Sequence, residues 1–193
     1  MSGYEEDREA EIRRLKLQLS AAQQKIDLLE ARANEDALLG ILNRRGLEEN
    51  LRRAIAFSDR YKMVAAMIYA DVDNFKAIND TYGHDAGDLA LRHLVSVLHA
   101  NTRGSDMVGR VGGDEFVILL WNATTEIAES KARALSAMLA RRPIIIDGQR
   151  VHVGISCGVS ELHGKDTAQQ ALARADRAMY QSKKSRKKAL TNA

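Results

Sequence analysis

The sequence has little that would tie the protein to an oxidising compartment or to a membrane. Its 193 residues contain one cysteine, Cys157, so neither an internal disulfide nor a cysteine-based zinc site can form. No apolar run reaches the roughly 18 residues of a membrane-spanning helix. The acidic N-terminus lacks the apolar region of a signal peptide. These absences predict a cytoplasmic protein with no membrane segment.

An excess of charge of one sign is also missing. The 29 Lys and Arg residues nearly balance 26 Asp and Glu residues, which leaves a net charge of +3. Most of the surplus positive charge lies near the C-terminus, in residues 183–188. This balance does not indicate a nucleic-acid partner, and we expect none. A content of 45% hydrophobic and 28% charged residues is typical of a globular protein, and the length suits one domain with an extension.

Residues 5–35 carry an apolar seam with heptad spacing. Its members alternate spacings of three and four, and they are Ile12, Leu15, Leu19, Ala22, Ile26, Leu29 and Ala33. A narrow seam over three heptads favours a parallel two-stranded coiled coil, although a lone amphipathic helix packed on its own domain would also carry an apolar face. We therefore expect a homodimer, with residues 1–35 as the dimerisation helix and residues 36–193 as the domain it carries.

From residue 36 onward, helix and strand patterns alternate. Helices are predicted at 47–62, 85–102, 125–142 and 167–185; a strand at 63–73; a hairpin at 106–121; and two strands in 144–160 that a turn at Asp147-Gly148 joins. Because hairpins occur beside helices, the pattern predicts an α+β domain with a mostly antiparallel sheet. The helices are expected to cover one or both faces of that sheet.

Four carboxylates lie at the ends of two predicted strands. Asp71 and Asp73 end the first strand, and Asp114 and Glu115 fall at the turn of the hairpin. If the strands are neighbours, their backbones lie roughly 5 Å apart, so the acids converge. Their mutual repulsion requires either bound protons or a divalent cation. A site of oxygen ligands alone favours Mg²⁺ or Mn²⁺.

Two further polar groups in this region fit a guanine nucleotide. The sequence has no EF-hand, Walker or Rossmann motif, so a phosphate cradle must be built another way. The turn after Asp73 offers backbone N–H groups and the ammonium of Lys76. The carboxylate of Asp88 could accept from the N1–H and 2-amino groups of guanine, and the amide of Asn79 could complement another edge of the base. Adenine lacks that donor pair.

Four stretches together resemble the GGDEF-domain family, the bacterial diguanylate cyclases. They are "LLGILNRR" at 38–45, "DVDNFKAINDTYGHDAGD" at 71–88, "GGDEF" at 112–116 and "ADRAMYQSKK" at 175–184. The resemblance covers residues 36 to about 188, with the motifs in the family's order. It implies a palm-like nucleotidyl-cyclase fold. It also implies that two GTP molecules are condensed into cyclic di-GMP, with release of two pyrophosphates.

The resemblance also implies a metal and catalytic set. Two Mg²⁺ or Mn²⁺ ions per active site would be bound by Asp71, the backbone carbonyl of Val72, Asp114 and Glu115. One of the two hairpin acids would help to deprotonate the attacking 3′-hydroxyl. The glycines before them, Gly112 and Gly113, would let the α-phosphate and ribose approach the backbone.

The remaining implied residues bind GTP. Those that would hold the triphosphate are Asn74, Phe75, Lys76, Lys183 and Lys187. Lys187 stands where the family usually has a phosphate-binding Arg, which keeps the charge but loses the bidentate geometry. Asn79 and Asp88 would read guanine, in agreement with the hydrogen-bond argument above.

The resemblance further implies a two-fold symmetric dimer and inhibition by the product. Because cyclic di-GMP is a two-fold ring, two subunits about a C₂ axis would each supply a half-site. Arg103-Gly104-Ser105-Asp106 matches the RxxD inhibitory site of the family, where cyclic di-GMP would bind as product and inhibitor. Arginines such as Arg133 of a neighbouring subunit could complete that site.

Two other functions are compatible with parts of the pattern. A GGDEF domain that has lost catalysis could serve as a receptor for cyclic di-GMP or GTP, but every motif acid and glycine is present here. A coiled-coil adaptor with a purely structural domain would leave the clustered acids unexplained. We therefore expect an active cyclase.

Overall fold

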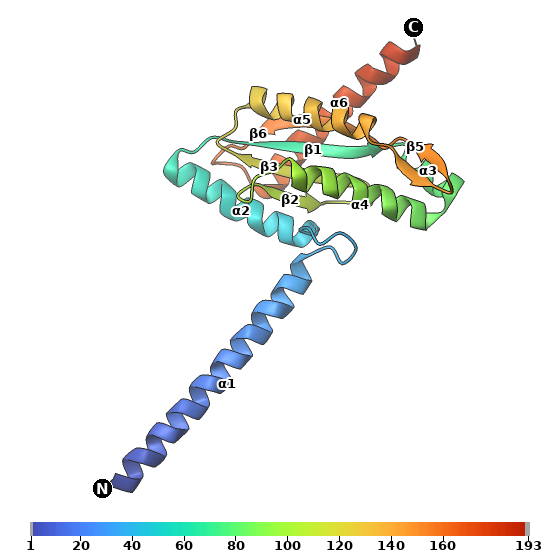
Figure 1. Cartoon of the computed structure of the whole chain (residues 1–193). Helices are drawn as coiled ribbons and strands as arrows, with labels where there is room; N and C mark the ends of the chain where they lie inside the picture. Colours follow the sequence, from blue (N-terminus) through green and yellow to red (C-terminus); the bar gives the residue numbers. More distant parts are fainter. Residues whose placement is uncertain (1, 192–193) are drawn as a thin grey trace.

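The structure, a computed structural model, describes residues 2–191, without the side chains of residues 2–6, 10, 28, 30, 31 and 185–191. The first helix, α1 (Ser2–Asn34), projects away from the domain (Figure 1). The predicted N-terminal helix is therefore confirmed. Seam residues such as Leu15, Leu19 and Leu29 are more than half exposed, at 51%, 70% and 54%. Pairing of this seam with a second copy stays a prediction.

Four antiparallel strands form the central sheet in the order β2-β3-β1-β6. Their bounds are β1 (Ala65–Asp73), β2 (Met107–Arg110), β3 (Glu115–Trp121) and β6 (Gly154–Glu161). Strand β1 has a hydrogen-bonded neighbour on each side and is buried on both faces over its first six residues. This position explains why its sequence is a continuous apolar run rather than an alternating one.

Helices cover both faces of the sheet (Figure 1). On one face lie α4 (His84–Ala100) and α5 (Thr125–Arg141), and on the other lie α2 (Arg44–Tyr61) and α6 (Ala168–Thr191). The predicted α+β class, with a mostly antiparallel sheet between helices, is confirmed. Within residues 2–191, every helix is too short or too polar to cross a bilayer.

Two local expectations were wrong. Residues 144–160 contain three strands, because β4 (Ile144–Ile146) and β5 (Gln149–Val151) form a separate two-stranded sheet before β6 begins. The turn between β4 and β5 does fall at Asp147-Gly148, where both residues have positive φ. A short helix, α3 (Phe75–Tyr82), follows β1 where only a turn was expected. Its eight residues give too weak a periodicity to be recognised.

Helix α6 approaches β6 closely at Gly158. A Cβ atom at this position would overlap the backbone of Met179 in α6. Glycine therefore allows the helix to lie directly on the strand. Lys183 follows Met179 by four residues, about one helical turn, so this contact also determines where the Lys183 side chain reaches.

Candidate functional site

The pairing of β1 with β3 brings the predicted acids together. Asp71 lies directly opposite Glu115, and the Val72 N–H donates to the Asp114 carbonyl at 3.0 Å. Opposite residues of an antiparallel pair place their side chains on the same face, here the one covered by α6. The two strands are therefore neighbours, as expected. The fourth acid, Asp73, accepts a 2.6 Å hydrogen bond from Ser156 Oγ of β6.

Burial and the charges of neighbouring carboxylates make Asp114 and Glu115 reluctant to ionise. Burial raises the pKa of Asp114, and the charge of Asp71 raises it further. Burial also raises the pKa of Glu115, as do the charges of Asp176, Asp114 and Asp71. A hydrogen bond with Tyr69 acts in the opposite direction and lowers this pKa. Such a group of carboxylates favours a bound proton or cation.

The Lys183 ammonium supplies one positive charge at this site. It donates a hydrogen bond to Asp71 Oδ1, and the two side chains are 30% and 15% exposed. Burial lowers the pKa of Lys183, but the hydrogen bond to Asp71 and the charges of Asp73 and Asp114 outweigh that effect, so the pKa is raised. In the described part of the chain, no three His, Cys, Asp or Glu side chains already form a metal cage.

Sequence reasoning missed Tyr69 as a partner of this site. Its hydroxyl is hydrogen-bonded to Glu115, and burial, followed by the charge of Glu115, raises its pKa above the usual value. Tyr69 precedes Asp71 by two residues, so strand alternation places both on one face. That spacing was the available signal, but it does not show that the phenol would reach a residue on β3.

The residues predicted to hold a triphosphate lie at the N-terminus of α3. Asn74 has a left-handed backbone, with φ 56°, and its side chain makes no capping hydrogen bond. Phe75 and Lys76 then open the helix, and the Lys76 side chain is exposed. A helix N-terminus whose N–H groups lack a side-chain acceptor favours an anion. The three residues immediately follow the acidic end of β1.

The residues predicted to read guanine lie on two packed helices. Asn79 belongs to α3 and Asp88 to α4, and both side chains are partly buried. A Cβ atom at Gly87 would overlap Asn79 Oδ1. The absence of a side chain at Gly87 therefore lets the Asn79 amide lie across α4, one residue before Asp88.

The two glycines before the acids differ in their surroundings. Residues 111–114, which join β2 to β3 and are called the GG turn below, are closed by a 2.9 Å hydrogen bond from Val111 N–H to the Glu115 carbonyl. A Cβ atom at Gly112 would collide with the Glu115 carboxylate, whereas the corresponding space at Gly113 is open. Approach of a substrate to this backbone stays a prediction.

The predicted inhibitory residues lie at the other end of β3. Asp106 accepts from the N–H groups of Arg103, at 2.9 Å, and of Trp121, the last residue of β3, at 3.4 Å. The Arg103 side chain is exposed. Since β3 has seven residues, about 20 Å separates this turn from the acids at the start of the strand.

The roles of two further predicted residues are not tested by this single chain. Arg133 pairs with Glu129 of the same helix, α5, at 3.5 Å. The side chain of Lys187 lies outside the described residues.

The fold and site define an α+β domain with a carboxylate centre where two neighbouring antiparallel strands meet. The chain belongs to the GGDEF-domain family, because residues 33–189 match the family described as "Diguanylate cyclase, GGDEF domain".

Known relatives agree with this assignment. A diguanylate cyclase of Vibrio cholerae is 37% identical over 153 residues, which cover 79% of this chain and 47% of that protein. The chain spans about half, or less, of the curated relatives it matches.

Solved structures show the same fold. The active GGEEF domain of a Vibrio cholerae diguanylate cyclase has a TM-score of 0.69 and 36% identity, over 74% of this chain and 91% of that one. The coiled coil and GGDEF domain of DgcB from Caulobacter crescentus, solved in complex with c-di-GMP, has a TM-score of 0.81 over 92% of this chain and 94% of that one. Its identity is 22%, so this likeness concerns the fold alone.

The raised pKa of Asp114 predicts a pH-dependent gain in stability for Asp114→Asn. A carboxyl group with a raised pKa binds more protons folded than unfolded, so stability falls as pH rises from about 4 through the raised value. In EDTA, Asp114→Asn should therefore melt at a higher temperature than the wild type at neutral pH. This difference should vanish toward pH ~3, below both pKa values.

The matched control is Asp80→Asn, which changes an exposed acid on α3. Differential scanning fluorimetry across this pH range checks the prediction. A wild type that melts at the same or a higher temperature than Asp114→Asn at neutral pH would contradict it.

Proposed function

We propose that the chain is the catalytic part of a diguanylate cyclase that condenses two GTP into cyclic di-GMP and releases two pyrophosphates. The observation that carries the proposal is the placement of Asp71 opposite Glu115, with Asp114 and Lys183 beside them. Membership of the GGDEF family supports the same reaction. A cytoplasmic location stays a prediction.

The residues around the acids suit a guanine nucleotide. Asn79 and Asp88 would bind the base from α3 and α4. The start of α3, at Asn74, Phe75 and Lys76, would bind phosphates through its N–H groups and the Lys76 ammonium. Lys183 would add a second ammonium from α6, and Lys187 would follow it one turn later.

The donor set fits divalent cations. Asp71, Asp114 and Glu115 offer oxygen ligands of the kind that Mg²⁺ and Mn²⁺ prefer, and a cation would relieve the repulsion that raises the pKa of Asp114 and Glu115. The Val72 N–H donates to the Asp114 carbonyl. Because the N–H and C=O of one strand residue point to the same side, the Val72 carbonyl also faces Asp114. Two bound cations would neutralise charge on the attacking and leaving oxygens.

The protein's own groups account for proton transfer and for the leaving group. In each half-reaction, the O3′ of one GTP forms a bond to the α-phosphorus of the other. The bond from that phosphorus to the oxygen bridging to the β-phosphate breaks, and pyrophosphate departs beside Lys183. The 3′-hydroxyl proton passes to the carboxylate of Asp114 or of Glu115.

The first test is product formation from GTP and Mg²⁺, read by chromatography. Wild-type chain should make cyclic di-GMP, and Asp114→Ala should lose at least about 100-fold in rate because it lacks a carboxylate of the cation and proton-transfer set. Lys62→Ala, which removes an exposed lysine at the end of α2, should retain activity. Cyclic di-GMP binding without product formation would instead identify a receptor.

We further propose that α1 pairs two domains about a C₂ axis, because the ring product requires two facing GTP molecules. Leu19→Glu in the seam should weaken the pairing and make activity per chain depend steeply on protein concentration. Leu17→Glu is the matched control, since Leu17 is equally exposed, at 72% against 70%, but lies outside the seam. Analytical ultracentrifugation measures the dimerisation of each variant, and cyclase assays at the same protein concentrations measure its activity. Equal dimerisation and activity in both variants would exclude the role of the seam.

We also propose that Arg103 and Asp106 bind the product as an inhibitor. The exposed guanidinium of Arg103 is available for a phosphate or base, beside a carboxylate that orders the turn. Arg103→Ala should raise the cyclic di-GMP concentration for half-inhibition by about 10- to 100-fold, because a charge-assisted hydrogen bond is lost. Ser105→Ala in the same turn is the control. Unchanged inhibition in Arg103→Ala would contradict this site.

A further inference from the structure

The end of β1 extends beyond its pairing with β3. That pairing runs as far as Asp71 opposite Glu115, whereas β1 continues to pair with β6 until Asp73 lies opposite Gly154. The next residue, Asn74, turns the chain into α3 with a left-handed backbone. The turn that would hold the triphosphate therefore begins where β1 has lost one of its two neighbouring strands.

A side-chain hydrogen bond from β6 supports the strand at this point. Ser156 lies directly opposite Asp71, and its Oγ donates to Oδ1 of the diagonal neighbour Asp73 at 2.6 Å. Ser156 is 2% exposed, so water competes little for the bond, and a carboxylate acceptor makes it stronger than a bond between neutral groups. A Cβ atom at Gly154 would lie only 3.1 Å from Asp73 Oδ2. The glycine therefore leaves room for the carboxylate to lie against β6.

The first residues of α3 are packed on one side only. Phe75 and Ile78 contact the apolar core on the face of the sheet that α4 and α5 cover. Asn74 and Ala77 are exposed, and both line a groove between α3 and the start of β6, to which Gly154 also belongs. On the side of this groove, the hydrogen bond from β6 is the contact that ties the turn to the sheet.

We propose that Ser156 and Asp73 are positioning residues for the triphosphate of GTP. Their hydrogen bond fixes the end of β1 against β6, so that the N–H groups at the start of α3 and the Lys76 ammonium are held in place for the phosphates. Asp73 contributes through the position of the backbone, unlike Asp71 and Glu115, which would bind a cation. This inference deepens the proposed function and rests on it.

The kinetic test compares Ser156→Ala with wild type in the full chain. Loss of the hydroxyl should raise the KM for GTP about 10-fold, because a hydrogen bond to a charged group no longer holds the phosphate-binding turn. The kcat should change by less than about threefold, since the register that brings Asp71 to Glu115 is untouched. KM does not depend on the folded fraction, so a partly unfolded variant would not imitate this result. An unchanged KM would overturn the proposal, as would a fall in kcat alone.

Ser160→Ala is the matched control on the same strand and the same face. Ser160 lies opposite Met67 and is 6% exposed, and its Oγ has no hydrogen-bond partner among the described residues. This variant loses a buried hydroxyl without breaking a hydrogen bond, so its KM and kcat should equal those of wild type. A KM raised equally in both variants would contradict a specific role of Ser156.

A double variant tests whether Ser156 acts through Asp73. In an Asp73→Ala background, Ser156→Ala should raise the KM no further, because the acceptor of its hydrogen bond is already gone. A further 10-fold rise in that background would show that the two side chains act independently and would overturn the pairing.

Two measurements do not depend on turnover. Calorimetry with a non-hydrolysable GTP analogue and Mg²⁺ should show about 10-fold weaker binding to Ser156→Ala than to wild type or Ser160→Ala. Hydrogen exchange of the peptide containing residues 73–80, without nucleotide, should be faster in Ser156→Ala alone. Equal exchange in all three proteins would overturn the proposal. If wild type makes no cyclic di-GMP, the proposed function fails, and the exchange measurement still decides whether Ser156 holds this turn.

Discussion

The register of β1 against β3 is the constraint on which the rest of the structure depends. It places Asp71 opposite Glu115 and, four residues earlier on β1, Met67 opposite Leu119. A slip of one residue would turn every side chain of one strand to the opposite face. Because both faces of these strands are buried against helices, such a slip would disrupt two apolar clusters at once. The cores on the two faces therefore also determine which carboxylates meet.

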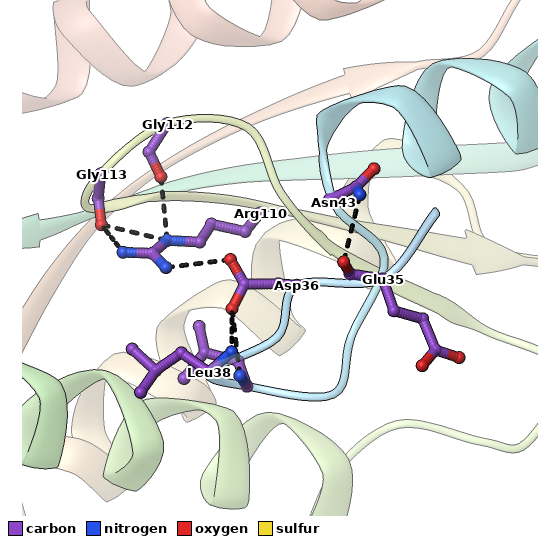
Figure 2. Close-up of polar contacts among 8 residues, drawn as sticks. Glu35, Asp36, Leu38, Asn43, Arg110, Gly112 and Gly113 are labelled. Atoms are coloured by element: carbon purple, nitrogen blue, oxygen red, sulfur yellow. Dashed lines mark hydrogen bonds and ion pairs between the residues drawn. The ribbon is translucent and has the colours of Figure 1, made fainter. Parts of the chain in front are cut away.

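Helix α6 and the α1–α2 connection complete the site from two sides. The close approach at Gly158 sets α6 on the sheet, and the Lys183 ammonium reaches Asp71 from there. From the connection, Asp36 accepts a hydrogen bond from Arg110, which also donates to the Gly113 carbonyl of the GG turn (Figure 2). The site thus combines a rigid sheet edge with two supports that lie outside the sheet, and one of them continues directly into α1. The exposed seam of α1 and the carboxylate site are then parts of one arrangement.

Much of the fold could be predicted because its signals are local. The heptad seam predicted α1, and alternating helix and strand patterns predicted the antiparallel sheet between helices. The division of residues 144–160 into three strands was missed, since an apolar pattern does not reveal where a chain passes from one sheet to another. The contact of Arg110 with Asp36 spans 74 positions, so no local pattern reports it. The roles given to the site residues stay predictions, although the acids do converge.

The most direct test of the central claim is anomalous diffraction from crystals grown with Mn²⁺ and a non-hydrolysable GTP analogue. We expect anomalous peaks about 2.1 to 2.3 Å from carboxylate oxygens of Asp71 and Glu115, with the analogue's phosphates at the start of α3. Bound analogue without Mn²⁺ beside these two residues would contradict the account, because the register of β1 and β3 would then have no role in holding a cation.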